Sequence, residues 1–120
     1  MTQYSKFIQK QRKIYREIGS IVCPALYNER VYFNNYGFNH LFRKNGNIRP
    51  IDDIHRRLNI LQEAVYIIQT SPTISEYRIS HRKNIPAHFW AIQGKVDNQN
   101  IKVILRKIDK GKLHFFSVYS

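Results

Sequence analysis

The chain has 120 residues, of which 42% are hydrophobic and 13% aromatic, so it suits one domain with a core and is too apolar for wholesale disorder. Its 20 Lys and Arg against 8 Asp and Glu leave a formal charge of +12, which favours polyanionic partners: nucleic acid first, then an anionic membrane surface or an acidic protein. Cys23 is the only cysteine, which excludes an internal disulfide. With neither a signal peptide nor a membrane span in the sequence, we expect a cytoplasmic protein, although a toxin domain detached from a secreted protein would look the same.

The first half of the chain predicts two helices and a strand. Residues 4–18 have apolar side chains at helical spacing and a basic opposite face, with Gly19 as the stop; core packing is favoured over binding to lipid. Residues 30–34 alternate as a short strand, and a turn at 34–37 then leads to His40. A second helix follows Pro50 and ends near Thr70, with one apolar stripe of Ile54, Leu58, Leu61, Val65 and Ile68.

The second half predicts strands at 76–80, 88–96, 101–108 and 112–119, joined by short turns. We therefore expect an α+β fold in which the helices pack on one face of a twisted, roughly four-stranded antiparallel sheet. The other face would be open and basic. The expected organisation is a single domain over 1–120, with an N-terminal helix in 1–22 and a sheet-and-helix core in 30–120.

The motifs narrow the chemistry to proton transfer at a phosphate. The sequence has no HExxH, no Cys or carboxylate cluster at ligand spacing, no GxSxG and no phosphate-binding glycine loop, so we expect neither a metal nor another cofactor. Basic residues, histidines and hydroxyls remain. RNA carries its own nucleophile, the 2′-OH, and its cleavage needs only a base, an acid and cations around phosphorus.

Positional arguments select among the basic residues. At about 100° per residue, Arg57 lies at the border of the apolar stripe and Arg56 faces away, so Arg57 either reaches the edge of the core or covers it as a snorkelling side chain. Alternation puts Lys102 and Arg106 on one strand face, roughly 13 Å apart, either in a groove or in solvent. The pattern of 113–119 does not decide which face meets the core, and Ser117 can bind a phosphate oxygen or be inert.

The segments VYFNNYGFNHL, RRLNILQEA and IKVILRKIDKGKLHFFSVYS resemble the phage and bacterial toxin branch of the barnase–EndoU–colicin–RelE-like (BECR) nucleases. The resemblance spans residues from about 30 to 120 and implies a four-stranded α+β fold, metal-independent endoribonuclease activity and an antitoxin or immunity protein as partner. It maps the His of the His-Leu step onto His40, the helical Arg onto Arg57 and the hairpin Ser onto Ser117. Basic residues of the penultimate strand would be Lys102 and Arg106.

The residue that would act with His40 as the second acid or base stays open. No glutamate stands where a barnase-type base is expected, His114 or His88 would serve as an EndoU-like second histidine, and Tyr77 or Tyr119 as a RelE-like tyrosine.

The first hypothesis is a toxin endoribonuclease that cuts RNA by 2′-OH attack and leaves a 2′,3′-cyclic phosphate, with an acidic antitoxin or immunity protein as its partner. The residues expected to be catalytic are His40, Arg57, Arg106 and Ser117. Those expected to bind substrate are Lys102, Tyr77, His114 and Arg49. The alternatives are a non-catalytic RNA- or DNA-binding module that stacks bases on exposed Tyr32, Tyr36, Phe38 and Tyr77, and a basic protein that docks an acidic partner.

Overall fold

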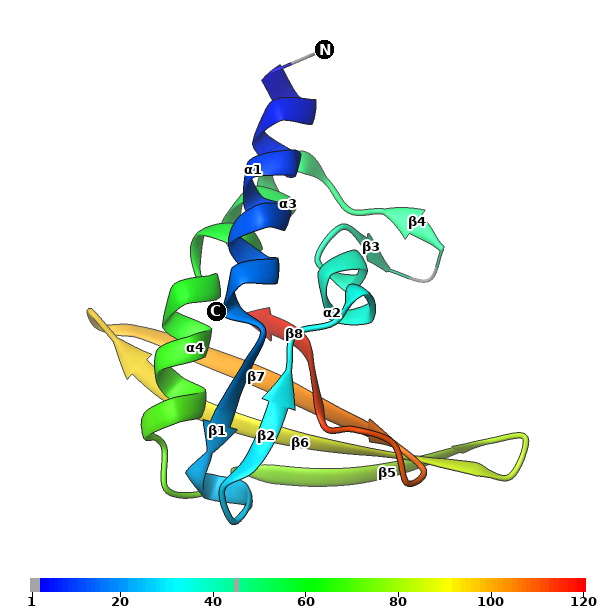
Figure 1. Ribbon diagram of the computed structural model, residues 1–120. Coiled ribbons are helices and arrows are strands. Elements are labelled where there is room, and N and C mark those ends of the chain that lie inside the picture. Colours follow the sequence, from blue (N-terminus) through cyan, green and yellow to red (C-terminus); the bar gives the residue numbers. More distant parts are fainter. Residues whose placement is uncertain (1–2, 45) are drawn as a thin grey trace.

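The computed structural model describes residues 3–44 and 46–120, and it places helices above a broad twisted sheet (Figure 1). In chain order its elements are α1 (Gln3–Ile18), β1 (Ser20–Cys23), the 3-10 helix η1 (Pro24–Leu26), β2 (Glu29–Tyr32), α2 (Asn35–His40), β3 (Arg43–Lys44), β4 (Asn47–Ile48), α3 (Ile51–Asn59), α4 (Leu61–Thr70), β5 (Glu76–Arg82), β6 (Ile85–Val96), β7 (Gln99–Ile108) and β8 (His114–Tyr119). The predicted α+β class is therefore correct.

The main sheet has six strands in the order β1-β2-β8-β7-β6-β5, so the expected four-stranded sheet was wrong in its size. The four predicted strands β5 to β8 are present and antiparallel, but β8 also pairs in parallel with β2 at Tyr32 and His114. The extra edge strand β1 lies in the region expected to continue the N-terminal helix to residue 22. Gly19, with φ +67, ends α1 and turns the chain into that strand.

The predicted second helix is in fact two helices, because the chain breaks at Ile60 between α3 and α4. Ile60 leaves helical geometry (φ −96, ψ 8) and is itself buried at the junction, which periodicity alone cannot show. The stripe still faces inward: Ile54, Leu58, Leu61 and Ile68 are buried, and Val65 is half-buried.

The helices do not all pack on one face of the sheet, which corrects the second part of the fold prediction. Helix α4 packs against β1, β6 and β7, whereas α2 packs against β8. Arg57, near the end of α3, reaches the carbonyl of Val118 in β8. Helix α2 and Arg57 of α3 thus both contact β8. Among the described residues, no helix is long and apolar enough to cross a membrane.

The core is anchored by an aromatic cluster that joins α1, α2 and β8. The Tyr15 ring lies 5.5 Å from Phe33, 5.1 Å from Phe38 and 6.1 Å from Phe115. Its hydroxyl donates to the Asn34 carbonyl at 2.8 Å, so this buried polar atom has a partner. Burial raises the pKa of Tyr15 far above its ordinary value. The core-packing interpretation of α1 is confirmed by these contacts; Tyr4 of the predicted stripe lies outside the residues whose side chains are described.

A bulge in β8 explains why its alternation was ambiguous. Val118 pairs with Val103 and Phe115 pairs with Leu105, but only Ile104 lies between those two β7 residues. Phe116 is the extra residue of the bulge. The core-facing residues of β8 are therefore three positions apart instead of two or four.

Replacing Gly37 with alanine tests the close approach of α2 to β8. An added Cβ would lie 2.2 Å from the Phe115 carbonyl oxygen and 2.6 Å from the Tyr15 hydroxyl. Although alanine favours a helix by about 1 kcal/mol over glycine, we expect Gly37→Ala to lower the free energy of unfolding by roughly 1–3 kcal/mol in urea denaturation. Asn39→Ala, an exposed change in the same helix, should stay within about 0.5 kcal/mol of the parent. A Gly37→Ala protein as stable as its parent would contradict this packing.

Candidate active site

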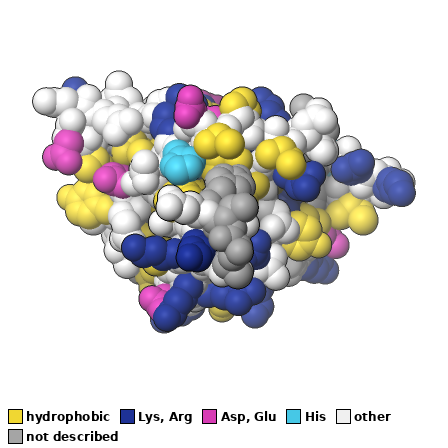
Figure 2. Space-filling model, turned by 90° about the horizontal axis from the view of Figure 1, so that it is seen from above, with side chains coloured by type: hydrophobic (Ala, Val, Ile, Leu, Met, Phe, Trp, Pro, Cys, Tyr) yellow, Lys and Arg dark blue, Asp and Glu magenta, His cyan; other side chains and the backbone are white. Residues whose placement is uncertain are grey.

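Positive charge is spread over the surface and is not confined to one tail. Figure 2 shows Lys and Arg side chains in several places on the face seen from above, with Asp and Glu interspersed among them. Charge alone therefore does not locate a site. The location comes from one region beside β8, in which buried and half-buried arginines, a histidine and an aromatic ring meet.

His40 is placed in this region by the short helix α2. Asn34 caps the helix by accepting a hydrogen bond from the Gly37 amide at 3.2 Å, and Phe38 anchors it in the core. His40, the last residue of α2, is half-buried and stacks on Phe116, with 4.3 Å between ring centroids and 25° between planes. The bulge residue of β8 thus forms the platform for the histidine.

Arg49 is the nearest cation to His40 and is 8% exposed. Its Nε donates to the His40 carbonyl at 3.0 Å, and its Nη1 lies 3.4 Å from Asp53 Oδ2. Its Nη2 lies 3.4 Å from His40 Nε2, which is longer than a good hydrogen bond. Arg49 therefore positions the backbone of His40 and leaves the ring nitrogen only weakly engaged.

The surroundings of His40 keep its imidazole neutral. Burial, followed by the positive charges of Arg49, Arg57, Arg106 and Lys44, lowers the pKa of His40 to about 4. At neutral pH the ring therefore carries no charge and can accept a proton. A bound anion would offset the neighbouring cations and raise this pKa.

Arg57 joins α3 to the last strand. Its Nη1 donates to Ser117 Oγ at 3.0 Å and to the Val118 carbonyl at 2.9 Å, while its Nε donates to Asp53 Oδ2 at 3.2 Å. Its side chain is 12% exposed, whereas that of Arg56 is 56% exposed, so the predicted difference between these arginines is confirmed. Arg57 is held at the edge of the core by hydrogen bonds.

Asp53 is the organising carboxylate of the site, and sequence reasoning missed it. It accepts hydrogen bonds from Arg49, Arg56 and Arg57. Burial alone would raise the pKa of Asp53, but the hydrogen bond from Arg56 and the charges of Arg57 and Arg49 outweigh it and lower the pKa. The i±4 spacing of Asp53 with Arg49 and Arg57 was the available signal.

Arg106 and His114 form a second pair beside Phe116. Arg106 Nε donates to His114 Nε2 at 2.9 Å, so His114 Nδ1 carries the proton that points to the Lys112 carbonyl, 3.2 Å away. The Arg106 guanidinium lies 4.5 Å from the Phe116 ring centroid. His114 is 5% exposed and its pKa is lowered, chiefly by burial. His114 therefore orients Arg106, whereas we expected His114 to contact the substrate.

Two of the predicted binding residues lie apart from this cluster. Lys102 shares a sheet face with Arg106, as predicted, but its Nζ pairs with Glu76 Oε1 at 2.8 Å. Tyr77 pairs in register with Trp90 on the opposite face of the sheet and is hydrogen-bonded to His88, so its assignment to the same site was wrong.

Two of the four aromatic residues expected to be exposed differ from that expectation. Phe38 is 1% exposed, because it packs in the core, and Tyr32 is half-buried. Tyr36 and Tyr77 are exposed.

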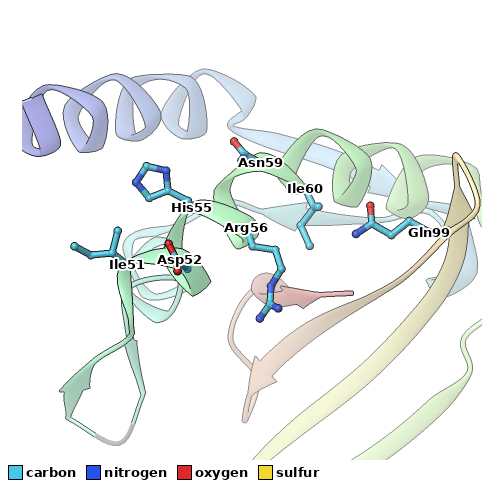
Figure 3. Close-up of a pocket in the computed structure, with 7 residues that line it drawn as sticks. All are labelled: Ile51, Asp52, His55, Arg56, Asn59, Ile60 and Gln99. Atoms are coloured by element: carbon cyan, nitrogen blue, oxygen red, sulfur yellow. The ribbon is translucent and has the colours of Figure 1, made fainter.

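A separate depression lies along the other side of α3 (Figure 3). It has a volume of about 560 Å³ and is lined by Ile51, Asp52, His55, Arg56, Asn59, Ile60 and Gln99. Its polar side chains point in different directions and do not converge on one place. The cluster around His40 is therefore the better candidate. In the described part of the chain, no group of three or more His, Cys, Asp or Glu is arranged to hold a metal ion.

Comparison of the chain with protein families, with characterised proteins and with solved structures finds no match. The resemblance to the BECR nucleases stays a prediction, and the functional argument rests on the geometry of the site.

Replacing Asp53 with asparagine tests the carboxylate that holds the arginines. We expect Asp53→Asn to lower the free energy of unfolding at pH 7 by about 2 kcal/mol, because hydrogen bonds to a charged partner are lost. Since the fold lowers the pKa of Asp53, its stabilisation is complete above the ordinary aspartate pKa of about 3.9 and is lost as the pH falls below it. The difference between the two proteins should therefore shrink in acid.

Asp52→Asn is the matched control, because this exposed carboxylate lies in the same helical turn. It should change stability by no more than about 0.5 kcal/mol. Equal effects of the two substitutions on stability would show that the hydrogen bonds of Asp53 to the arginines do not stabilise the fold.

An NMR titration tests the environment of His40. We expect its imidazole to titrate near pH 4, and Arg49→Gln to raise that midpoint because one neighbouring cation is removed. Arg56→Gln, which removes an exposed arginine from the same cluster of ion pairs, should leave the midpoint unchanged. A midpoint near the ordinary histidine value of about 6.5 in the parent protein would disprove this environment.

Proposed function

We propose that this protein is an endoribonuclease that cleaves RNA without a metal ion, with its active site beside β8. The observation that carries the proposal is the placement of His40, which is stacked on Phe116 with Arg106 on the same ring and Arg49 beside its nitrogen. Burial and these cations lower the pKa of His40, so the ring can accept a proton at neutral pH. A proton acceptor among cations suits a reaction in which a hydroxyl attacks a phosphate.

The proposed reaction is a transfer of the phosphoryl group within the RNA. His40 takes the proton of the 2′-hydroxyl, and the 2′-oxygen forms a bond to phosphorus. The bond from phosphorus to the 5′-oxygen breaks, and this oxygen takes a proton from water. The products are a 2′,3′-cyclic phosphate and a free 5′-hydroxyl, and His40 returns its proton to solvent.

The arginines have two roles in this proposal. Arg106 binds the phosphate and stabilises the charge that develops on its oxygens, because it has no carboxylate partner among the described residues. Arg49 and Arg57 are held by Asp53 and act mainly by positioning His40 and Ser117. The bound phosphate also raises the pKa of His40, so that the base becomes stronger in the complex.

A toxin role is the biological setting we propose. A basic ribonuclease surface is complementary to an acidic antitoxin or immunity protein, which would stop cleavage by covering the site. The resemblance to toxin nucleases supports this setting.

A nucleic-acid-binding module without catalysis is the second candidate, and one observation favours it. Arg57 and Ser117 already satisfy each other, so two residues expected to be catalytic are occupied in the free protein. Such a module would bind RNA through the same arginines but would not cut it.

Incubation of the protein with RNA in EDTA tests the proposal. The parent protein should generate 2′,3′-cyclic phosphate ends, and His40→Ala should reduce the rate by about 10²–10⁴-fold because the proton acceptor is lost. On the acid side, kcat/KM should fall as the pH drops through about 4, where His40 of the free protein becomes protonated.

His81→Ala is the matched control, because His81 is exposed on β5, and it should retain full activity. His40→Gln is a second variant that keeps a polar side chain at the same place. Circular dichroism of both His40 variants would show whether either has a folding defect. Cleavage that is equal in the parent and both His40 variants would remove His40 from the site. Salt-dependent RNA binding with no cleavage would favour the binding module.

A further inference from the structure

We infer that the substrate is single-stranded RNA that crosses the open face of the sheet at right angles to the strands, along a row from Arg106 over Phe89 to Arg78. This inference rests on the proposed function, because it names the class of substrate that the same site would take. It adds Arg78 and Phe89 as binding residues, which neither spacing nor resemblance had selected.

The register of the sheet forms this row. Arg78 of β5 lies directly opposite Phe89 of β6, Phe89 opposite Arg106 of β7, and Arg106 opposite His114 of β8. Residues that are direct partners share one face of a sheet. With neighbouring strands about 4.8 Å apart, the row extends roughly 14 Å from β8 to the edge strand β5. One end of the row therefore lies beside Phe116, the ring on which His40 stacks.

Cations and aromatic rings alternate along the row. The Arg78 guanidinium lies 4.9 Å from the Phe89 ring centroid, and that of Arg106 lies 4.5 Å from Phe116. The two phenylalanine rings meet edge to face at 5.4 Å. Guanidinium groups bind phosphates and aromatic rings stack on bases, which is the combination that binds a single strand without base pairing.

The charges of this row are available to a ligand. Among the described residues, neither Arg78 nor Arg106 has a carboxylate partner, whereas Arg49 and Arg57 share Asp53 and Lys102 is paired with Glu76. A depression of about 230 Å³ also lies on this face, and its lining includes Arg78, Phe89 and Lys102. Of the two unpaired arginines, Arg78 lines this hollow, together with Glu76 and its partner Lys102.

The rows on either side are less suited to a phosphate chain. On one side, Ser80, Ala87 and Ile108 are partners, and on the other, Glu76, Ala91 and Ile104 are partners. Neither row carries a cation, and the second carries Glu76, whose carboxylate is already paired with Lys102. The substrate is therefore guided along one row. Because stacking requires bases free of a complementary strand, an unpaired segment fits this row better than a duplex.

Binding of 2′-deoxy oligonucleotides, which lack the attacking hydroxyl and cannot be cleaved, tests the row by fluorescence anisotropy. We expect Arg78→Ala to weaken binding of a hexanucleotide and to reduce the slope of log affinity against log salt by about 0.7, the value for one phosphate contact on a single strand. A dinucleotide, which cannot reach β5 from the His40 site, should lose less. Phe89→Leu keeps an apolar side chain but removes stacking, and should weaken hexanucleotide binding by about 5–100-fold.

Arg82→Ala is the matched control, because Arg82 is exposed on the same strand and the same face but outside the row. Equal effects of Arg78→Ala and Arg82→Ala, or duplex RNA that binds as tightly as a single strand, would overturn the inference. The outcome is separable from that of the proposed function. If the protein never cleaves RNA but binds the hexanucleotide less tightly without Arg78, the proposed activity is wrong and the binding row is supported. If it cleaves RNA and binds equally well without Arg78, the proposed activity is supported and the binding row is wrong.

Discussion

The carboxylate of Asp53 is the point at which the parts of the site depend on one another. It accepts hydrogen bonds from Arg49, which holds the carbonyl of His40, and from Arg57, which holds the end of β8. Two cations in close proximity repel each other, so each needs this shared anion to remain in a position that is largely shielded from water. One aspartate thereby fixes the position of α2 relative to α3 and the last strand.

Four of the arginines consequently form two pairs with different physical roles. Arg49 and Arg57 have their charges balanced inside the protein and act as structural ties. Arg106 and Arg78 lie on aromatic rings with no carboxylate partner among the described residues, so no carboxylate balances their charge inside the protein. The net charge of +12 therefore includes arginines whose charge is balanced inside the protein and others whose charge is left for a polyanion.

Local patterns predicted most of the elements and some of the site. Alternation in 101–108 correctly placed Lys102 and Arg106 on the face opposite Val103, and helical spacing separated Arg57 from Arg56. The break at Ile60 escaped prediction because the apolar stripe continues through it. Tyr77 was expected to bind substrate beside Arg106, but it lies on the other face because of its pairing with Trp90, which spacing along one strand does not specify.

The sequence by itself determined the α+β class, the strong positive charge and the residue types suited to phosphate chemistry, since these follow from composition and short-range periodicity. Only the tertiary structure decided which residues meet. The bulge that turns Phe116 towards His40, the sharing of Asp53 by two arginines and the row from Arg106 to Arg78 all depend on strand register and helix docking. Those are contacts between segments far apart in the chain, and no local pattern encodes the distance between them.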